Sequence, residues 1–424
     1  MPEDFLHFIW LYQLFDHLRL QSTLGEDIQV LSPGVHNHNS GPDFSEARIR
    51  IANTLWVGNV EIHVSSSDWL LHQHQYDPAY SNVILHVVFE DDLKTKNGNL
   101  EHLPTVELKG RIDQSKFLQW KRLNKNTTWL PCEKLIANVP PIVVSQMITR
   151  SAIDRLERKV EDVEIVLSKL NGHWDSALMQ TLIIALGSKV NKESFRSFAS
   201  LLPYEFIRKN ERENLKLQAL LFGIAGFLEG ELKDEYPRKL KEEFTFLKRK
   251  YEFTIMNVTN WKFMRMRPSN FPTIRIAQLA QLFSNWSAFS KCLFYGQDIL
   301  EVNSYFIEEI NPYWQSHFRF DKRSTFKTKK MGISMLNNIL INGVVPFLYA
   351  YGKQHDELRF QDSALAILEH LKPETNNILR EWKSRGIEAK SALESQGLIE
   401  LKNNYCSSKK CLSCKIGVWI LNPN

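Results

Sequence analysis

Imidazole and carboxylate side chains gather in one short stretch of this 424-residue sequence. Both groups bind divalent cations, and burying them beside apolar strands costs free energy unless they are paired or bind a ligand. We therefore expect metal-dependent chemistry here; the alternative is a set of polar groups satisfied at sheet edges and turns. The stretch holds six of the 13 histidines and comprises His36, His38, Asp43, Glu61, His63, Asp68, His72, His74, Asp77 and His86.

One pattern within this stretch has the spacing of a metal site. A Pro-Asp pair ending at Asp43 is followed by Glu61-Ile62-His63. Alternation over residues 55–64 predicts a strand with Glu61 and His63 on one face, and Asp43 is expected at the start of a neighbouring strand. The two carboxylates would hold Mg²⁺ or Mn²⁺. The ion would lower the pKa of a bound water, which His63 would orient or deprotonate.

A second candidate site lies between two predicted strands. His72 and His74 would share one face if they lay on a strand but would diverge on a helix, and Asp77 is a nearby carboxylate. Such a set suits Zn²⁺. It predicts, as the alternative to the first site, a zinc-dependent hydrolase of a smaller substrate.

The elements that must position these residues follow from periodicity and turn formers. Apolar residues at helical spacing predict an amphipathic helix over residues 4–20, and residues 32–42 are expected to form a loop. The apolar run 83–89 predicts a strand buried on both faces. Residues 65–82 are long enough for a helical crossover between two parallel strands. The predicted strands are residues 47–51, 55–64, 83–89 and 105–109.

This order of elements resembles the core of the PD-(D/E)XK nucleases. In that family the Asp and Glu bind the metal, and a Lys positions or activates the attacking water. Asp43 and Glu61 match the two carboxylates, whereas His63 stands where the family has Lys. The resemblance implies a mixed-sheet α/β domain that cleaves DNA or RNA. The His leaves open a metal-ligating role for His63, or a catalytically inactive nucleic-acid-binding scaffold. Glu107-Leu108-Lys109 is a literal E-x-K far from Asp43 and is not preferred.

A broader resemblance covers most of the chain. The stretch from Gly34 to Val88, the segment from Arg265 to Arg275 and the terminal cysteines resemble a family of uncharacterised bacterial proteins. That family, a domain of unknown function, implies no established activity.

Charge and composition divide the chain near residue 135. Residues 1–135 hold 12 Lys and Arg against 17 Asp and Glu, a net charge of −5, and the remainder carries +10. Helical periodicity dominates after residue 136, for example over 143–170, 174–190, 272–291 and 391–404. We therefore expect an α/β metal-site domain over residues 1–135 and a mainly helical domain over 136–424. Neither an export signal nor a 20-residue apolar span is apparent, which favours the cytoplasm and no membrane.

Four cysteines are expected to form a second metal site. Cys406, Cys411 and Cys414 are spaced C-x4-C-x2-C, which is typical of thiolate ligands. Cys132 is the preferred fourth ligand, because Cys292 lies in an apolar context that indicates core packing. Some PD-(D/E)XK nucleases are similar in holding an iron–sulfur cluster with one distant and three clustered cysteines, and Zn²⁺ would serve the same structural purpose. The alternative is a surface tail with free thiols.

Two basic segments are candidate nucleic-acid contacts. One interleaves basic residues with Phe318, Phe320 and Phe326, a combination that suits phosphates and stacked bases. The other is a Pro-rich turn before a helix expected to begin near Thr273. Structural arginine networks or solvated loops would produce the same patterns. The candidates are Arg265, Arg267, Arg275, Lys322, Arg323, Lys327, Lys329 and Lys330.

Overall fold

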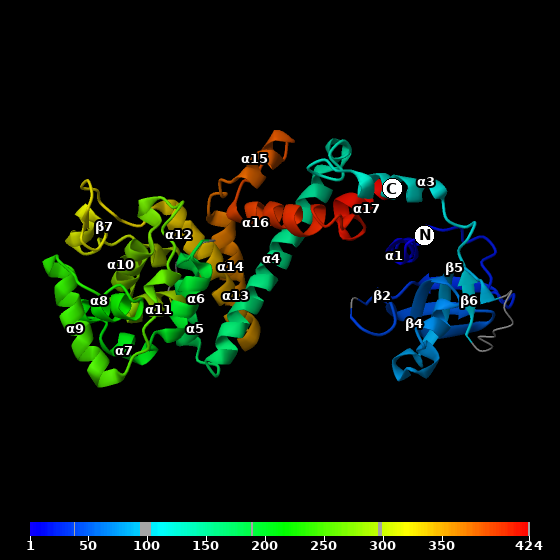
Figure 1. The fold of residues 1–424 in the computed structure, drawn as a ribbon. Helices are drawn as coiled ribbons and strands as arrows, with labels where there is room; N and C mark the ends of the chain where they lie inside the picture. Colours follow the sequence, from blue (N-terminus) through cyan, green and yellow to red (C-terminus); the bar gives the residue numbers. More distant parts are fainter. Residues whose placement is uncertain (38, 94–102, 188–189, 296–298, 423–424) are drawn as a thin grey trace. The chain divides into compact units, whose positions relative to one another are not determined.

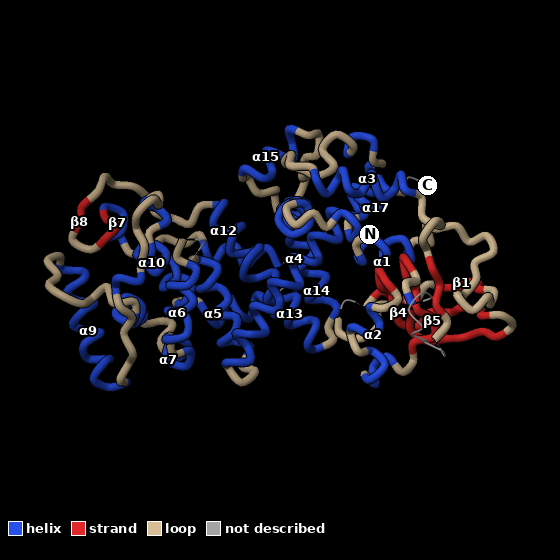
Figure 2. Tube along the Cα trace, turned by 45° about the vertical axis from the view of Figure 1, so that its right-hand side comes forward, coloured by secondary structure: helices blue, strands red, loops and turns tan. Residues whose placement is uncertain are grey.

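A computed structural model describes residues 1–37, 39–93, 103–187, 190–295 and 299–422. The chain divides into two compact units. The first unit combines residues 1–147 with 402–424, and the helical unit comprises residues 148–401. The predicted division at residue 135 differs from this one, because the C-terminal segment packs with the N-terminal residues. Figures 1 and 2 show the strands of the main sheet gathered in the first unit.

The first unit contains a mixed sheet, as the sequence predicts. Its strands run in the order β1-β3-β4-β5-β6, and β2 pairs with β3 outside this path. The β1–β3 and β3–β4 pairs are antiparallel, while β4–β5 and β5–β6 are parallel. The strands are β1 (Ile28–Ser32), β2 (Val35–His36), β3 (Phe44–Ile51), β4 (Thr54–Ser65), β5 (Val83–Glu90) and β6 (Thr105–Glu107).

Two parts of the first unit differ from the prediction. β1 and β2 were not expected, and β2 lies within the stretch predicted to be a loop. The crossover between β4 and β5 is helical only over α2 (Asp68–Leu71), which is followed by two single 3-10 turns. Gln73 has a φ of 60°, which ends the helix, and Pro78 starts the second 3-10 turn. The crossover is therefore a chain of turns that holds His72 and His74 in separate short elements.

Helix α1 (Glu3–Leu11) covers the sheet but is shorter than the predicted 4–20. Gln13 and Arg19 adopt positive φ, which takes the chain out of the helix. Phe5, Ile9 and Trp10 are buried, and the helix packs against β4. The apolar face of α1 therefore fixes the polar residues of this helix near β4.

Close packing of β4 against the start of β5 and the residue before it gives a direct test of this architecture. A Cβ at Gly58 would lie 2.4 Å from Ile84 Cγ2 and 2.8 Å from the Asn82 carbonyl oxygen. We expect Gly58→Ala to lower the free energy of unfolding by about 1–3 kcal/mol in urea titrations. Gly332→Ala is the control, because its Cβ meets open space. Equal stability of the two variants would contradict the close β4 packing.

The helical unit matches the prediction of a mainly helical region. Its buried apolar side chains form one large core, with only a short β7–β8 hairpin (His317–Arg319, Lys322–Arg323) among the described residues. The predicted helix 272–291 is two helices, which break at Ser284 and Asn285. Helix α4 (Pro141–Lys169) begins in the first unit, which includes residues up to 147. The other helices are α5 (Trp174–Leu186), α6 (Lys192–Leu201), α7 (Tyr204–Lys209), α8 (Asn214–Ile224), α9 (Glu235–Tyr251), α10 (Pro272–Phe283), α11 (Trp286–Tyr295), α12 (Ile333–Ile339), α13 (Val345–His355), α14 (Leu358–His370), α15 (Asn377–Ser384) and α16 (Ala392–Glu400).

One segment of the described chain, Ile333–His355, is long and apolar enough to cross a membrane by length and composition. It consists of α12, a π-helical turn (Leu340–Val344) and α13. Many of its apolar side chains lie in the core of the helical unit. Burial in that core accounts for its composition.

Candidate metal centre

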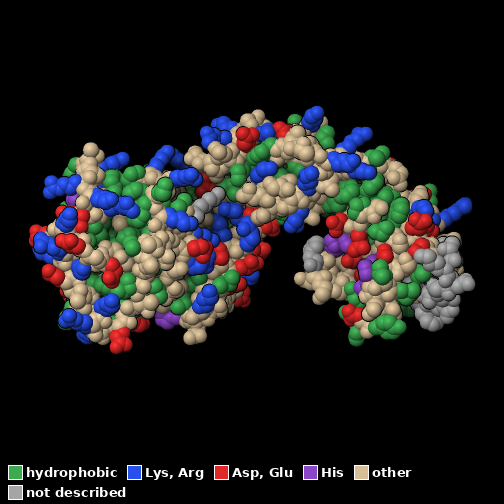
Figure 3. All heavy atoms as spheres, in the orientation of Figure 1, with side chains coloured by type: hydrophobic (Ala, Val, Ile, Leu, Met, Phe, Trp, Pro, Cys, Tyr) green, Lys and Arg blue, Asp and Glu red, His purple; other side chains and the backbone are tan. Residues whose placement is uncertain are grey.

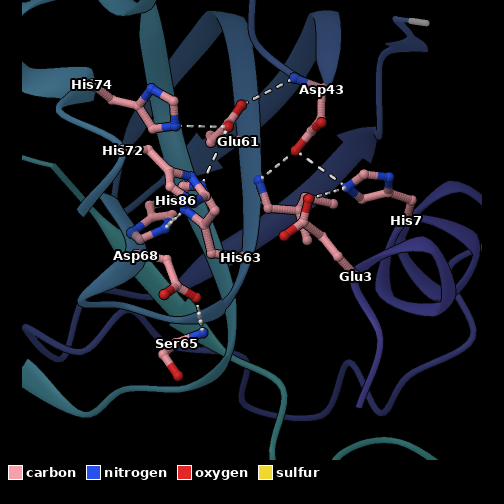
Figure 4. A network of polar contacts seen from close by, with 11 residues as sticks. Glu3, His7, Asp43, Glu61, His63, Ser65, Asp68, His72, His74 and His86 are labelled. Atoms are coloured by element: carbon pink, nitrogen blue, oxygen red, sulfur yellow. Dashed lines mark hydrogen bonds and ion pairs between the residues drawn. The ribbon is translucent and has the colours of Figure 1, made fainter. Parts of the chain in front are cut away.

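The acidic and imidazole residues converge at the sheet of the first unit, on β4 and its neighbours (Figure 4). Glu61 and His63 lie on one face of β4, as the strand period predicts. The antiparallel register pairs Phe44 with Val60, so Asp43 at the start of β3 is brought beside Glu61. The parallel register pairs Glu61 with His86 of β5. Figure 3 shows histidine and acidic side chains together on the surface of this unit.

Two hydrogen bonds hold Asp43 against Glu61 and Ile62 of β4. The Asp43 backbone N–H donates to Glu61 Oε2 over 3.1 Å, and the Ile62 N–H donates to Asp43 Oδ2 over 2.9 Å. Helix α1 adds His7, whose Nε2 lies 3.2 Å from Asp43 Oδ2 and 3.9 Å from Glu3 Oε1. The two carboxylates therefore have fixed positions, and the His7 imidazole lies against Asp43.

The other oxygen of Glu61 faces a group of imidazoles. Glu61 Oε1 lies 3.5 Å from His63 Nε2 and 3.4 Å from His74 Nε2. His72 Nδ1 lies 3.3 Å from His63 Nε2, and the donor atoms of the three histidines all lie within 4.8 Å of one another. Ligands of tetrahedral Zn²⁺ at about 2.0–2.1 Å are separated by about 3.4 Å. Three of the separations among these four donors therefore have the length of an edge of a zinc tetrahedron.

Burial sets the protonation of the central pair. Glu61 is 5% exposed, and this burial, with the charge of Asp43, raises the pKa of its carboxyl to about 8. His63 is 1% exposed, and burial, followed by the nearby His74 and His72, lowers the pKa of its imidazole to about 4. A neutral imidazole has a lone pair for a metal, and a cation would stabilise the ionised form of Glu61.

Contacts outside the four donors orient the imidazoles. His63 Nδ1 lies 2.9 Å from Nε2 of the fully buried His86, so one ring N–H of this pair donates to the other. If His63 is the donor, the lone pair of its Nε2 faces Glu61 and His72, the arrangement usual for a metal-binding histidine. His74 stacks on Tyr80 at 3.8 Å, and its buried Nε2 has no hydrogen-bond partner in the described part of the chain. A metal ion would satisfy that nitrogen.

One predicted detail of this site needs correction. Asp77 does not join His72 and His74, because it is exposed and its Oδ1 accepts the Ala79 N–H at the start of a 3-10 turn. Glu61 takes that place beside the histidines. His63 lies among the ligand atoms, and its lowered pKa makes it a ligand candidate before a base. His38 lies outside the described residues.

Residues from α1 are the part of the site that was not singled out from the sequence. Burial acts to lower the pKa of His7, but its hydrogen bond and charge interaction with Asp43, together with Glu3, outweigh this and raise it. Glu3 and His7 lie one helical turn apart on α1, but no short-range signal links that face of the helix to β4. The lysine of the E-x-K sequence does not belong to this site: exposed Lys109 forms an ion pair with Glu90 at 2.5 Å.

The predicted nucleic-acid residues separate into exposed and buried ones. Arg275 is buried and donates to Gln278 and Asn270, and Lys329 is buried and donates to the carbonyls of Trp314 and Gln315. These two charges serve the fold, so neither is placed to contact a nucleic acid. The others are exposed: Arg265, Arg267, Lys322, Arg323, Lys327 and Lys330.

The four predicted cysteine ligands all lie in the first unit. Cys132, Cys411 and Cys414 are buried, and Cys406 is partly buried. Cys292 packs against the core of the helical unit, as its apolar context suggests.

Comparisons with known proteins give a family but no activity. No curated protein matches the chain, and no solved structure matches it. The model of one family, described as "Protein of unknown function (DUF2851)", matches residues 3–377. The match spans nearly the whole sequence, and the chain therefore belongs to the DUF2851 family.

Proposed function

We propose that the first unit is a metal-dependent phosphodiesterase that cleaves nucleic acid with a metal-activated water. The observation that carries the proposal is the convergence of donor atoms from His63, His72 and His74, which all lie within 4.8 Å of one another, with Glu61 Oε1 at 3.5 Å from His63 and 3.4 Å from His74. Glu61 and His63 are buried, His74 is partly buried and His72 is exposed, and no salt bridge to Lys or Arg neutralises Glu61 among the described residues. A divalent cation would satisfy these groups together.

The donor set favours Zn²⁺ as the ion. Three imidazole nitrogens and one carboxylate oxygen suit a borderline metal, whereas Mg²⁺ prefers oxygen ligands. The Asp43–Glu61 pair supports the original expectation of Mg²⁺ or Mn²⁺. The two readings use opposite oxygens of Glu61, since Oε2 faces Asp43 and Oε1 faces the histidines. Metal preference therefore tells which side of Glu61 binds the ion.

Two observations support a phosphodiester as substrate. The structure contains α1, β3, β4, the crossover and β5 in the order on which the resemblance to PD-(D/E)XK nucleases rests, although β1 and β2 precede β3. The chain also carries exposed basic residues such as Lys322, Arg323 and Lys327, which suit a polyanion.

The roles of the residues follow from their surroundings. A metal ion supplies a water of lowered pKa and neutralises charge on a phosphate oxygen. His7 retains its proton more readily than an ordinary imidazole, and Asp43 holds it at the site. His7 is therefore placed to supply the positive charge, or the proton for a leaving oxygen, that a Lys at position 63 would provide.

Cleavage assays test this proposal. Labelled single- and double-stranded DNA and RNA would be incubated with wild type, Asp43→Asn and Glu61→Gln, with Mg²⁺, Mn²⁺, Zn²⁺ or EDTA. We expect metal-dependent cleavage that falls about 10²–10⁴-fold in both variants. Each variant removes a carboxylate that, with the metal, contributes several kcal/mol to stabilising the transition state. Lys109→Ala, in the E-x-K sequence outside the site, is the control and should retain full activity.

The remaining outcomes favour specific rivals. The nitrogen-rich donor set also fits a zinc hydrolase of a smaller substrate, which would bind Zn²⁺ at this site and turn over small esters while leaving nucleic acids intact. Metal-independent binding of nucleic acid without turnover would indicate a scaffold. Cleavage equal in wild type and both carboxylate variants would refute the proposed site.

A further inference from the structure

The segment that contains three of the cysteines packs against the chain around the fourth. Lys402 Nζ donates to the Trp129 carbonyl over 2.7 Å and lies 4.8 Å from the centre of its ring. Lys409 Nζ donates to the Asn124 carbonyl over 2.5 Å. The Lys415 N–H contacts Met147 Sδ at 3.3 Å. These contacts lie on both sides of Cys132 in sequence, so residues 402–415 are held against the loop that carries it.

Tight turns connect the three clustered cysteines. Cys406 ends a π-helical turn, Lys409 has a φ of 53°, and Cys411 begins a 3-10 turn that leads into α17 (Lys415–Leu421) at Cys414. A Cβ at Gly417 would lie 2.1 Å from the Cys411 carbonyl oxygen. Only glycine allows α17 to approach this turn so closely.

The four thiols interact with one another. Burial, then the charges of Cys414 and Cys411, raises the pKa of the Cys132 thiol to about 12. Burial, followed by the charges of the other three cysteines, also raises the pKa of the Cys406 thiol. Burial and the charge of Cys414 raise the pKa of the Cys411 thiol to about 12. Lys402 and Lys409 act in the opposite direction on Cys406 and Cys411. The four cysteine side chains therefore lie close enough to affect one another, beside the ammonium groups of Lys402 and Lys409.

We propose that Cys132, Cys406, Cys411 and Cys414 are the ligands of a thiophilic metal centre that joins residues 402–424 to the N-terminal part of the first unit. Four thiolates form the closed ligand set of structural sites, which bind Zn²⁺ or an iron–sulfur cluster. Three of the residues are buried, as is usual for structural metal sites, so the centre stabilises the fold. The inference stands independently of the proposed function.

Metal analysis of the full chain, purified without oxygen, tests the proposal. Zinc, iron and acid-labile sulfide would be measured in wild type, Cys132→Ser, Cys411→Ser and the control Cys292→Ser. We expect wild type and the control to hold either one tightly bound zinc or a stoichiometric iron–sulfur cluster with visible absorption. Both ligand variants should lose it, and their melting temperature should fall. A His72→Ala/His74→Ala variant should keep this metal, which separates the thiolate centre from the histidine site.

Thiol reactivity of folded wild type covers the case in which the Ser variants do not fold. A thiol reagent should leave these four cysteines unmodified in the metal-loaded protein and modify them after a strong chelator is added. The proposal is overturned if wild type holds no metal beyond that lost in the double His variant. It is equally overturned if the four thiols react at the same rate with and without chelator.

Discussion

His72→Ala/His74→Ala is expected to weaken Zn²⁺ binding at the histidine site by at least about 100-fold. Loss of a hydrogen-bonding partner behind a metal ligand typically costs 10–100-fold, so loss of two direct ligands costs more. Cleavage should fall with the bound metal. His72 is exposed and His74 only partly buried, and both lie in short turns, so the sheet should keep its stability.

Competition titration with a chromogenic chelator measures this affinity. Co²⁺ provides a second readout, because cobalt bound by nitrogen and oxygen absorbs differently from cobalt bound by thiolates. His17→Ala is the matched control, since His17 is an exposed histidine of the same unit whose ring contacts the Gln13 carbonyl. An unchanged affinity in the double variant would move the ion to the Asp43 side of Glu61.

The second large effect is expected in the pH dependence of stability. Glu61 has a folded pKa of about 8, above its ordinary value of 4.5, so the folded state binds the extra proton. Stability from this group is present below pH 4.5 and is lost as pH rises through 8, at about 1.4 kcal/mol per unit in the steep range. His63 has a folded pKa of about 4, and its contribution changes in the opposite direction between pH 4 and 6.5. We therefore expect the net loss between about pH 6.5 and 8.

Urea titrations of chelator-treated wild type and Glu61→Gln over this pH range measure the effect. The glutamine cannot ionise. From pH 6.5 to 8, the unfolding free energy of wild type should therefore fall by about 2 kcal/mol relative to that of Glu61→Gln. Added Zn²⁺ should remove the pH dependence of wild type, because the ion replaces the proton on Glu61. Parallel curves for both proteins would show that Glu61 ionises normally in the folded state.

Local periodicity was sufficient to predict the centre of the candidate site. The alternation along β4 placed Glu61 and His63 on one face, and a hairpin between β3 and β4 is a short-range pairing that brings Asp43 to Glu61. The mixed sheet and the helical region after it were likewise predicted from hydrophobic period and run length.

Other parts of the site depend on contacts that no local pattern encodes. His7 meets Asp43 only because α1 packs on a strand some 50 residues later in the chain. Asp77 was predicted to bind metal from its proximity in sequence, but a Pro at the next position makes it a cap of a 3-10 turn. Arg275 and Lys329 belong to basic segments, yet their partners Asn270 and the Trp314 carbonyl place them inside the fold. Charge patterns alone do not distinguish these cases.

The first unit is formed by two segments that are far apart in the sequence, and this affects the order in which the units can fold during synthesis. Residues 148–401 are synthesised between the two segments of that unit, so the helical unit can fold before residues 402–424 emerge from the ribosome. During that interval the sheet and its histidines exist without α17 and the clustered cysteines. We therefore expect a chain that ends at residue 401 to lose stability in the N-terminal unit, which lacks α17 and the clustered cysteines, more than in the helical unit.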